Sequence, residues 1–177
     1  RQMCIRDSIN KGDEENPEYR SRLVAQELKR DRSLELFAAT PPLEAVKLLL
    51  SRAVTEGVGY SRGQRKLGMK IDFIDVRRAY FHAKSKRRVF VKLPDEDHEE
   101  GYCGELERSM YGTRDAAQNW QAECSQQLID NGFTRGSASP CVLYHEARGI
   151  RTLVHGDDYV STGMPKYLQW LRRTSKL

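Results

Sequence analysis

Cysteine is scarce in this sequence, and its spacing does not indicate a metal finger. The four cysteines are Cys4, Cys103, Cys124 and Cys141, with no Cys-x-x-Cys pair and no histidine beside them at zinc-ligand spacing. Isolated thiols on a chain without a secretory signal indicate a reducing compartment. Long apolar runs are also missing, because none approaches the roughly 20 residues needed to span a bilayer. We therefore expect no zinc site and no membrane partner.

Apolar and aromatic residues are sparse as well, yet they are patterned. Hydrophobic residues make up 38% of the chain, charged residues 31% and aromatic residues 8%, and the mean hydropathy is −0.71. The 177 residues suffice for one domain with a hydrophobic core. The net charge of +5 and pI near 9.1 suit a protein that meets phosphate backbones, although many soluble proteins are equally basic.

The two ends of the chain have no clear place in a domain. Residues 1–8 show no pattern continuous with the neighbouring residues, and we interpret them as a non-native leader. The chain stops within a charged, helix-like stretch over 167–177. We expect one domain over 9–177 that is incomplete at its C-terminal end.

Two stretches have the periodicity of helices. Thr40 is placed to cap a helix whose first turn contains Pro41 and Pro42, and Leu43, Val46, Leu50 and Ala53 would form its apolar face. A longer helix is predicted over 107–131 and closed by Gly132. Its core-facing stripe consists of Ala116, Trp120, Cys124 and Leu128.

The remaining patterns predict short strands. Met69, Ile71 and Phe73 alternate with polar residues and predict a strand with one buried face, which leads into a turn and a short helix over 77–84. Further strands are expected over 22–26, 89–93, 141–144, 153–155 and 159–161. Tyr60–Lys66 is a basic loop suited to nucleic-acid contact. His82, His98 and His145 lack partners at metal-ligand spacing and are expected on the surface.

Carboxylates at two points in the sequence are the candidates for a catalytic metal site. Asp75 ends one apolar strand, and the hairpin turn Gly156-Asp157-Asp158 comes after another apolar strand 82 residues later. Mg²⁺ prefers carboxylate oxygens together with water and substrate phosphates, and two such ions serve phosphoryl transfer. Aspartates are common in turns and Asp72 is equally acidic, so these residues alone leave the catalytic interpretation open.

Five segments in order resemble motifs of the copia-type (Ty1/copia) retrotransposon reverse transcriptases. They are Arg20-Ser21-Arg22-Leu23-Val24-Ala25-Gln26, Phe37-Ala38-Ala39-Thr40-Pro41, Phe73-Ile74-Asp75-Val76-Arg77-Arg78-Ala79-Tyr80-Phe81, Ser109-Met110-Tyr111-Gly112-Thr113-Arg114-Asp115-Ala116-Ala117-Gln118-Asn119-Trp120 and Leu153-Val154-His155-Gly156-Asp157-Asp158. Together they cover about Arg20 to Gly163. Five motifs in the family's order are highly specific, although each is weak by itself.

The resemblance implies an α+β right-hand polymerase, with an antiparallel palm sheet packed against helices and truncated before the thumb. Its fingers would lie over about 20–64 and 105–120, with the palm in the remainder. Asp75, Asp157 and Asp158 would be the catalytic triad and would hold two Mg²⁺, or Mn²⁺, with the Val76 carbonyl as a further ligand. Deoxynucleotide contacts fall to Arg20, Arg22, Val76 and Tyr80, the last as an aromatic gate against the ribose 2′-hydroxyl.

The implied partners are an RNA or DNA template-primer, a dNTP and the rest of a pol polyprotein with integrase, thumb and RNase H. The implied location is cytoplasmic, in virus-like particles, with entry to the nucleus. The 177 residues alone are expected not to extend a primer, because the family's primer-gripping segments come after the aspartate pair. Two departures stand out: His155-Gly156 replaces Tyr-Val, and Asp115 replaces a glutamine.

Three other functions remain open. A degenerate retroelement relic would fold poorly and catalyse nothing, yet the intact aspartates argue against decay of the site. A metal-dependent nuclease or phosphatase would need an activating histidine or more acidic ligands in context. A plain nucleic-acid-binding module would not explain why the aspartates lie within the motifs.

Overall fold

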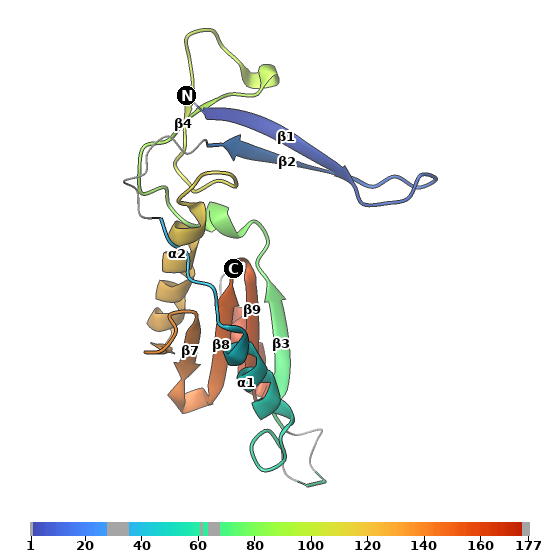
Figure 1. Cartoon of the computed structure of the whole chain (residues 1–177), viewed down its shortest axis with the longest axis vertical. Helices are drawn as coiled ribbons and strands as arrows, with labels where there is room; N and C mark the ends of the chain where they lie inside the picture. Colours follow the sequence, from blue (N-terminus) through green and yellow to red (C-terminus); the bar gives the residue numbers. More distant parts are fainter. Residues whose placement is uncertain (1, 28–35, 61, 64–67, 175–177) are drawn as a thin grey trace. The chain divides into compact units, whose positions relative to one another are not determined.

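The computed structural model describes residues 2–27, 36–60, 62–63 and 68–174. The chain divides into two compact units (Figure 1). Unit 1 comprises Arg1–Phe37 and Tyr80–Trp120, and unit 2 comprises Ala38–Ala79 and Gln121–Leu177. Each unit therefore combines two segments that lie far apart in the sequence.

Unit 1 contains a small sheet in the order β2-β1-β4-β5. Strands β1 (Gln2–Asn10) and β2 (Tyr19–Gln26) form an antiparallel hairpin, β4 (Phe90–Lys92) runs parallel to β1, and β5 (Gly104–Glu105) pairs with β4. The segment interpreted as a leader thus pairs with β2 from Met3 to Asn10, and its non-native origin stays a prediction. Buried Ala25, Val89, Val91 and Met110 form the core of this unit.

Short 3-10 helices complete unit 1. The expected short helix after the first aspartate is present as η1 (Ala79–His82), and η2 (Asp95–Asp97) lies within the acidic loop. Ala79, at the boundary with unit 2, and Ala83 are buried.

Unit 2 contains an antiparallel sheet in the order β3-β9-β8-β7-β6. Its strands are β3 (Lys70–Asp75), β6 (Thr134–Arg135), β7 (Val142–His145), β8 (Ile150–His155) and β9 (Asp158–Gly163), with η3 (Glu146–Arg148) between β7 and β8. The hairpin expected around the aspartate pair is the β8–β9 connection. Strand β3 lies at one edge of this sheet, and among the described strands only β9 pairs with its backbone.

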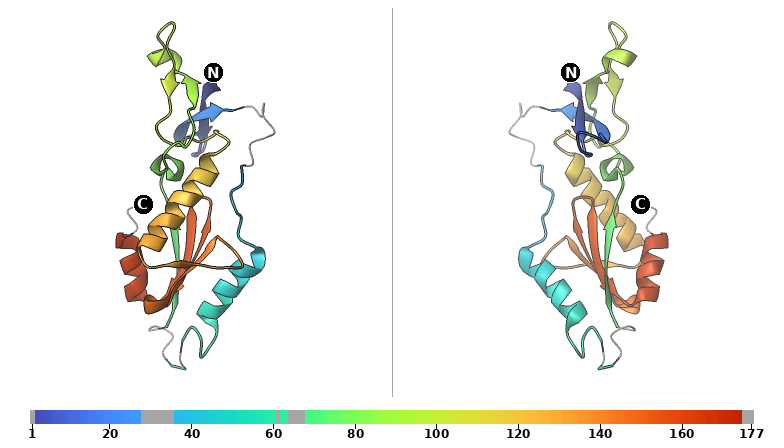
Figure 2. Two further views of the ribbon diagram at one scale, coloured as in Figure 1. Left: turned by 90° about the vertical axis from the view of Figure 1, so that its left-hand side faces the viewer. Right: turned by 90° about the vertical axis from the view of Figure 1, so that its right-hand side faces the viewer.

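Helices α1 (Leu43–Val54) and α3 (Pro165–Thr174) lie on opposite sides of this sheet (Figure 2). The prediction that Thr40 caps α1 is wrong: Pro42 occupies the cap position without a side-chain hydrogen bond. The expected apolar face is also partly wrong, since Leu43 is 59% exposed while Leu49 and Ala53 are buried.

Helix α2 spans Ala116–Asp130, so its predicted start at 107 is wrong. The preceding residues are used in turns and in short hydrogen-bonded links that a helix could not make. The predicted stripe is confirmed, because Ala116, Trp120, Cys124 and Leu128 are all buried. Gly132 ends this segment with a φ of +88°.

Two predicted side-chain environments are corrected. Ile71 and Phe73 share a sheet face, but α1 covers that face beside Ile71 and leaves Phe73 66% exposed. His145, expected on the surface, is buried against the rings of Phe133 and Trp170, with centroids 5.1 Å and 5.4 Å away. Trp170 comes from α3, so only the tertiary fold brings it to the end of β7.

The mixture of helices with one antiparallel sheet and one mostly antiparallel sheet agrees with the predicted α+β class. The division into fingers over 20–64 and 105–120 and palm elsewhere stays a prediction. Within the described ranges, no helix is both long and apolar enough to cross a membrane.

Candidate active site

The register of unit 2 brings the predicted aspartates to one end of the sheet. Asp75, the last residue of β3, is the cross-strand partner of Asp158, the first residue of β9. Directly paired residues in an antiparallel ladder have Cα atoms about 4.5–5.5 Å apart and side chains on the same face. Both aspartates are exposed.

The third predicted aspartate lies in the turn between β8 and β9. His155 pairs with Asp158, so Gly156 and Asp157 are the two central residues of a tight hairpin. Gly156 has a φ of +61°, which side chains with a Cβ rarely adopt and which a hairpin with a primed turn requires at its first position. The Asp157 carbonyl accepts a hydrogen bond of 2.9 Å from the Val76 amide, which ties the turn to the end of β3.

His155 extends this row on the same face of the sheet. It pairs with Asp158 on one side, and Asp158 pairs with Asp75 on the other. Two residues further along the same ladder, on the same face, Phe73 pairs with Val160. The substitution of histidine for tyrosine therefore places an imidazole next to a carboxylate at an exposed sheet end.

The structure also distinguishes Asp72 from Asp75 by their surroundings, which the sequence alone did not show. Side chains alternate between the faces of a strand, so residues three apart point to opposite sides. Asp72 accepts hydrogen bonds from Nε (2.8 Å) and Nη2 of Arg172, which lies on α3. Asp75 lies on the other face, opposite Asp158, and is the better candidate for a metal ligand.

Three of the residues predicted to contact a nucleotide, Arg20, Arg22 and Tyr80, belong to unit 1. Arg20 and Arg22 are exposed on β2, and Arg20 is paired with Glu18 at 3.5 Å. Tyr80 lies on η1 with its ring 4.5 Å from the ring of Tyr111. The aspartates and Val76 belong to unit 2.

The chain matches the family described as reverse transcriptase (RNA-dependent DNA polymerase) over residues 8–164. This match covers most of the sequence and includes every predicted site residue. The chain belongs to the reverse transcriptase family. No solved structure matches it.

The donor set of this reverse transcriptase suits a hard cation that is shared with a substrate. Across the part of the chain that the structure describes, no three His, Cys, Asp or Glu side chains are grouped so that they could hold a metal. Mg²⁺ is commonly bound by only one or two carboxylates, with water and substrate phosphates as the other ligands. The exposed pair of Asp75 and Asp158, with Asp157 beside them in the turn, fits that mode.

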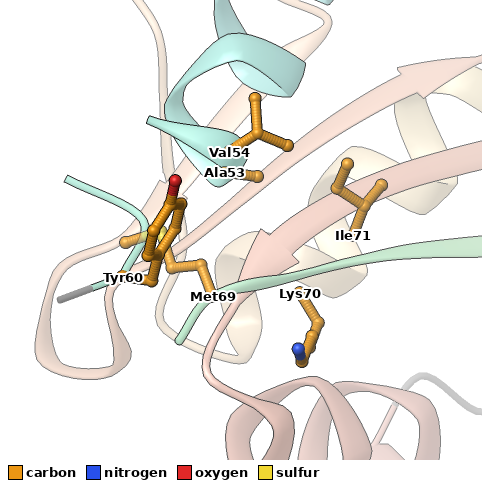
Figure 3. Close-up of a pocket in the computed structure, with 6 residues that line it drawn as sticks. All are labelled: Ala53, Val54, Tyr60, Met69, Lys70 and Ile71. Carbon is orange, nitrogen blue, oxygen red and sulfur yellow. The ribbon is translucent and has the colours of Figure 1, made fainter. Parts of the chain in front are cut away.

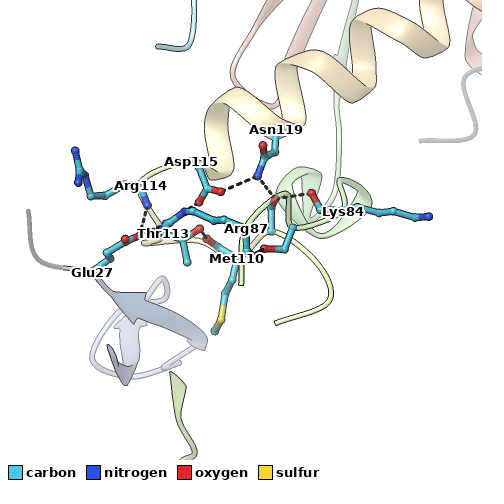
Figure 4. Close-up of polar contacts among 10 residues, drawn as sticks. Glu27, Lys84, Arg87, Met110, Thr113, Arg114, Asp115 and Asn119 are labelled. Carbon is cyan, nitrogen blue, oxygen red and sulfur yellow. Dashed lines mark hydrogen bonds and ion pairs between the residues drawn. The ribbon is translucent and has the colours of Figure 1, made fainter. Parts of the chain in front are cut away.

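An ionic network in unit 1 of the reverse transcriptase was not predicted from the sequence (Figure 4). Arg87 donates hydrogen bonds to Glu27 at 2.5 Å and to Asp115 at 2.9 Å. Asn119 donates to Asp115 at 3.1 Å, and the Arg114 amide donates to Glu27 at 2.7 Å. The sequence carries no signal for this network, because Glu27 and Arg87 lie 60 residues apart.

This network explains the acidic departure at Asp115. Burial raises the pKa of Asp115, but hydrogen bonding and attraction from Arg87 outweigh it, and the net pKa is lowered. The pKa of Glu27 is likewise lowered, since the bonds from Arg87 and the Arg114 amide overcome the effect of burial. Asp115 is 4% exposed, so it acts as a buried partner of Arg87.

The Tyr111-Gly112 motif is held against β2 by its backbone. The Ala25 amide donates to the Tyr111 carbonyl at 2.8 Å. Gly112 has a φ of +89°, and a Cβ there would lie 1.7 Å from the Ala25 carbonyl oxygen. Only glycine permits this close approach, which gives the glycine of the motif a physical reason.

A pocket of about 300 Å³ lies beside the start of β3 (Figure 3). It is lined by Ala53, Val54, Tyr60, Met69, Lys70 and Ile71. Lys70 begins β3 and Asp75 ends it, so the two places are about 17 Å apart along the strand. Tyr60 begins the loop Tyr60–Lys66 that is predicted to contact nucleic acid, and residues 61 and 64–66 of this loop lie outside the described residues.

Proposed function

We propose that this chain carries the catalytic centre of a copia-type retrotransposon reverse transcriptase. Membership of the family supports RNA-directed DNA polymerase activity for a retroelement. The finer proposal is nucleotidyl transfer from a dNTP to a primer 3′-hydroxyl with two Mg²⁺, or Mn²⁺ in their place. The observation that carries it is the cross-strand pairing of Asp75 with Asp158 beside the turn that holds Asp157.

Each aspartate has a distinct part in this proposal. Asp75 and Asp158 enter from neighbouring strands, and Asp157 enters from the turn, whose carbonyl is fixed by the Val76 amide. Two bound metal ions would activate the attacking hydroxyl and neutralise the leaving pyrophosphate. Because the carboxylates stand at strand ends, the sheet holds them in place while leaving them open to substrate. The Val76 carbonyl remains a proposed further ligand.

The nucleotide would be bound by Arg20, Arg22, Val76 and Tyr80. Arg20 and Arg22 are exposed guanidinium groups, which match phosphate oxygens well. Tyr80 offers an aromatic ring that is steadied by Tyr111 and would exclude a ribose 2′-hydroxyl. We propose that the fingers comprise about residues 20–64 and 105–120 and that the remainder forms the palm.

The wider setting is part of the same proposal. A reverse transcriptase domain implies a template-primer and dNTP as binding partners. Integrase, thumb and RNase H segments would belong to the same polyprotein, with the cytoplasm and virus-like particles as the place of action. On this view the 177 residues need those segments to grip a primer, because a small misplacement of the 3′-hydroxyl can cost about 100-fold in rate.

The decisive experiment is primer extension on a primed RNA template by the polymerase that contains these residues. Asp157→Asn should reduce extension to less than about a tenth, because a neutral amide cannot balance the charge of the metal. Asp97→Asn is the matched control, since Asp97 is an exposed aspartate in η2 and outside the site. It should extend the primer as the parent does.

Two outcomes would count against the proposal. Substantial extension by Asp157→Asn would remove Asp157 from the metal ligands. A folded parent enzyme that extends no primer with Mg²⁺ or Mn²⁺ would favour the degenerate relic. Loss in both aspartate variants would indicate a general loss of folding, which circular dichroism would detect.

A further inference from the structure

Strand β3 carries Asp75 at the edge of its sheet, where only one side of its backbone is paired. Its ladder partner is β9, and the outer edge has no strand in the described sheet. Edge strands leave backbone groups unpaired, and the ends of such strands open most easily. Asp75 is the last residue of β3, so its position depends on what holds that outer edge.

Arg172 of α3 holds the outer edge of β3. Its Nε donates to Oδ2 of Asp72 at 2.8 Å, and its Nη2 donates both to Oδ1 of Asp72 and, at 3.1 Å, to the carbonyl oxygen of Phe73. The planar guanidinium thus binds a side chain and a backbone acceptor of adjacent residues. A bidentate contact of this kind fixes direction as well as distance.

The pairing is more constrained than an ordinary surface ion pair. The Asp72 side chain is only 15% exposed, although the Arg172 side chain is 53% exposed. The third bond goes to the backbone, so a shift of α3 would shift the strand itself. The residues bound, Asp72 and Phe73, are three and two positions before Asp75.

The end of β3 is therefore held from two sides. On the inner side, the ladder with β9 ends at the pair of Asp75 and Asp158, and the Val76 amide bonds to Asp157. On the outer side, Arg172 binds Asp72 and the Phe73 carbonyl. Asp75 lies between these two attachments and faces away from α3.

We infer that Arg172 is a positioning residue for the metal site, acting through Asp72 and the backbone of β3 on the carboxylate of Asp75. This inference rests on the proposed role of Asp75 as a metal ligand. Arg172 lies outside residues 8–164, which match the family. Its guanidinium bonds to Asp72 and to the Phe73 carbonyl, so its effect would reach the metal through the strand.

The test measures metal affinity on the 177-residue chain with Mn²⁺ as a paramagnetic probe, using electron paramagnetic resonance of the free ion. Arg172→Gln should weaken Mn²⁺ binding about tenfold, the low end of what loss of an outer-shell support costs a metal site. Arg173→Gln is the matched control, because the neighbouring arginine is exposed on the same helix. It removes the same charge and should leave the affinity unchanged.

Two further variants separate positioning from general stability. The exchange Asp72→Arg with Arg172→Asp keeps an ion pair between β3 and α3 but loses the bond to the Phe73 carbonyl, because a carboxylate cannot donate, and it should restore part of the lost affinity. Arg172→Lys keeps the charge but loses the planar fork, and it should give an intermediate affinity. Thermal unfolding is measured for each variant. If Arg172→Gln does not fold, the Mn²⁺ affinity of Arg172→Lys is compared with that of Arg173→Gln instead. A weaker affinity in Arg172→Lys would then support the positioning role, and an equal affinity would overturn it.

The outcomes distinguish this inference from the proposed function. Asp75→Asn should abolish Mn²⁺ binding at the site; if it does not, the proposed metal site is wrong. If Asp75→Asn abolishes binding while folded Arg172 variants bind Mn²⁺ like the parent, the metal site stands and the positioning role of Arg172 is overturned. An equal loss of Mn²⁺ affinity in Arg172→Gln and Arg173→Gln would also overturn the positioning role, because it would reflect only the loss of one positive charge.

Discussion

At the scale of single residues, surroundings rather than residue type separate the aspartates. Asp72 and Asp75 lie on one strand with the same carboxylate, yet one is bound to Arg172 and the other faces Asp158. The alternation of a strand accounts for this difference, because three positions reverse the face. Alternation could be read from the sequence, but the partner on each face could not.

Tyr80 offers a test of sugar selection at this scale. Replacing Tyr80 with Val in the polymerase should raise ribonucleotide incorporation and leave deoxynucleotide incorporation largely intact, because the ring that would exclude the 2′-hydroxyl is lost. Tyr80→Phe keeps the ring against Tyr111 and is the matched control. The measurement is the ratio of ribo- to deoxynucleotide incorporation, and an unchanged ratio in the Val variant would place discrimination elsewhere.

Gly156 offers a second test. Its φ of +61° lies where a β-branched residue is strained, and a Cβ there would meet nothing within 4 Å. A side chain at position 156 would therefore destabilise the fold through backbone strain and not through a steric clash. Gly156→Val should lower the free energy of unfolding by roughly 1–2 kcal/mol, and Gly156→Asn by less, because asparagine tolerates this region better. Urea unfolding measures both, and equal stabilities of parent and Val variant would contradict the assignment.

At the scale of elements, ionic contacts join segments that are distant in the sequence. Glu27 comes directly after β2, Arg87 precedes β4 and Asp115 directly precedes α2, and one guanidinium bonds to both carboxylates. The side chains of these two carboxylates are only 8% and 6% exposed, and both pair with Arg87. Removing the Arg87 guanidinium should therefore lower the free energy of unfolding more than removing a partner of any exposed ion pair.

Arg87→Met is the corresponding prediction. It should lower the free energy of unfolding at pH 7 by about 3–5 kcal/mol, because two buried carboxylates lose their partner. Urea unfolding measures this change. Arg88→Met is the matched control: Arg88 is the neighbouring arginine, and its pair with Glu105 is exposed. A variant of Arg87 no less stable than the control would show that the network contributes little.

The same network predicts a pH dependence. The folded-state pKa values of Glu27 and Asp115 are lowered, so their stabilisation is present above the ordinary carboxyl pKa and is lost as pH falls through the folded values. The difference in unfolding free energy between parent and Arg87→Met should therefore narrow from pH 7 to about pH 3. A difference that stays constant over this range would contradict the lowered pKa values.

At the scale of the whole molecule, the net charge of +5 should give nucleic-acid binding that depends on salt. Affinity for an RNA–DNA hybrid should fall as salt rises, since cationic side chains release counterions from phosphates. Arg22→Gln should reduce the slope of log affinity against log salt by about one phosphate contact. Fluorescence anisotropy gives the slope. Asp97→Asn should not reduce it, and an unchanged slope for Arg22→Gln would remove Arg22 from the contacts.

Much of the architecture could be predicted from local patterns. The stripe from Ala116 to Leu128, the tight turn at Gly156 and the strands on either side of it are encoded by spacing and turn chemistry within a few residues. Helix limits were less predictable: Thr40 does not cap α1, and the turns before α2 displace its start. Those limits depend on contacts with other segments, which no local pattern contains.

By itself, the sequence determined the family, the three aspartates and the hairpin that presents two of them. These features are encoded within runs of roughly a dozen residues, where spacing and residue type suffice. Only the tertiary structure decided that Asp75 pairs with Asp158, that Arg172 holds Asp72, and that Arg87 compensates for Asp115. Each of these pairs joins residues 28 to 100 positions apart, and such contacts exist only once strand register and helix packing bring the elements together.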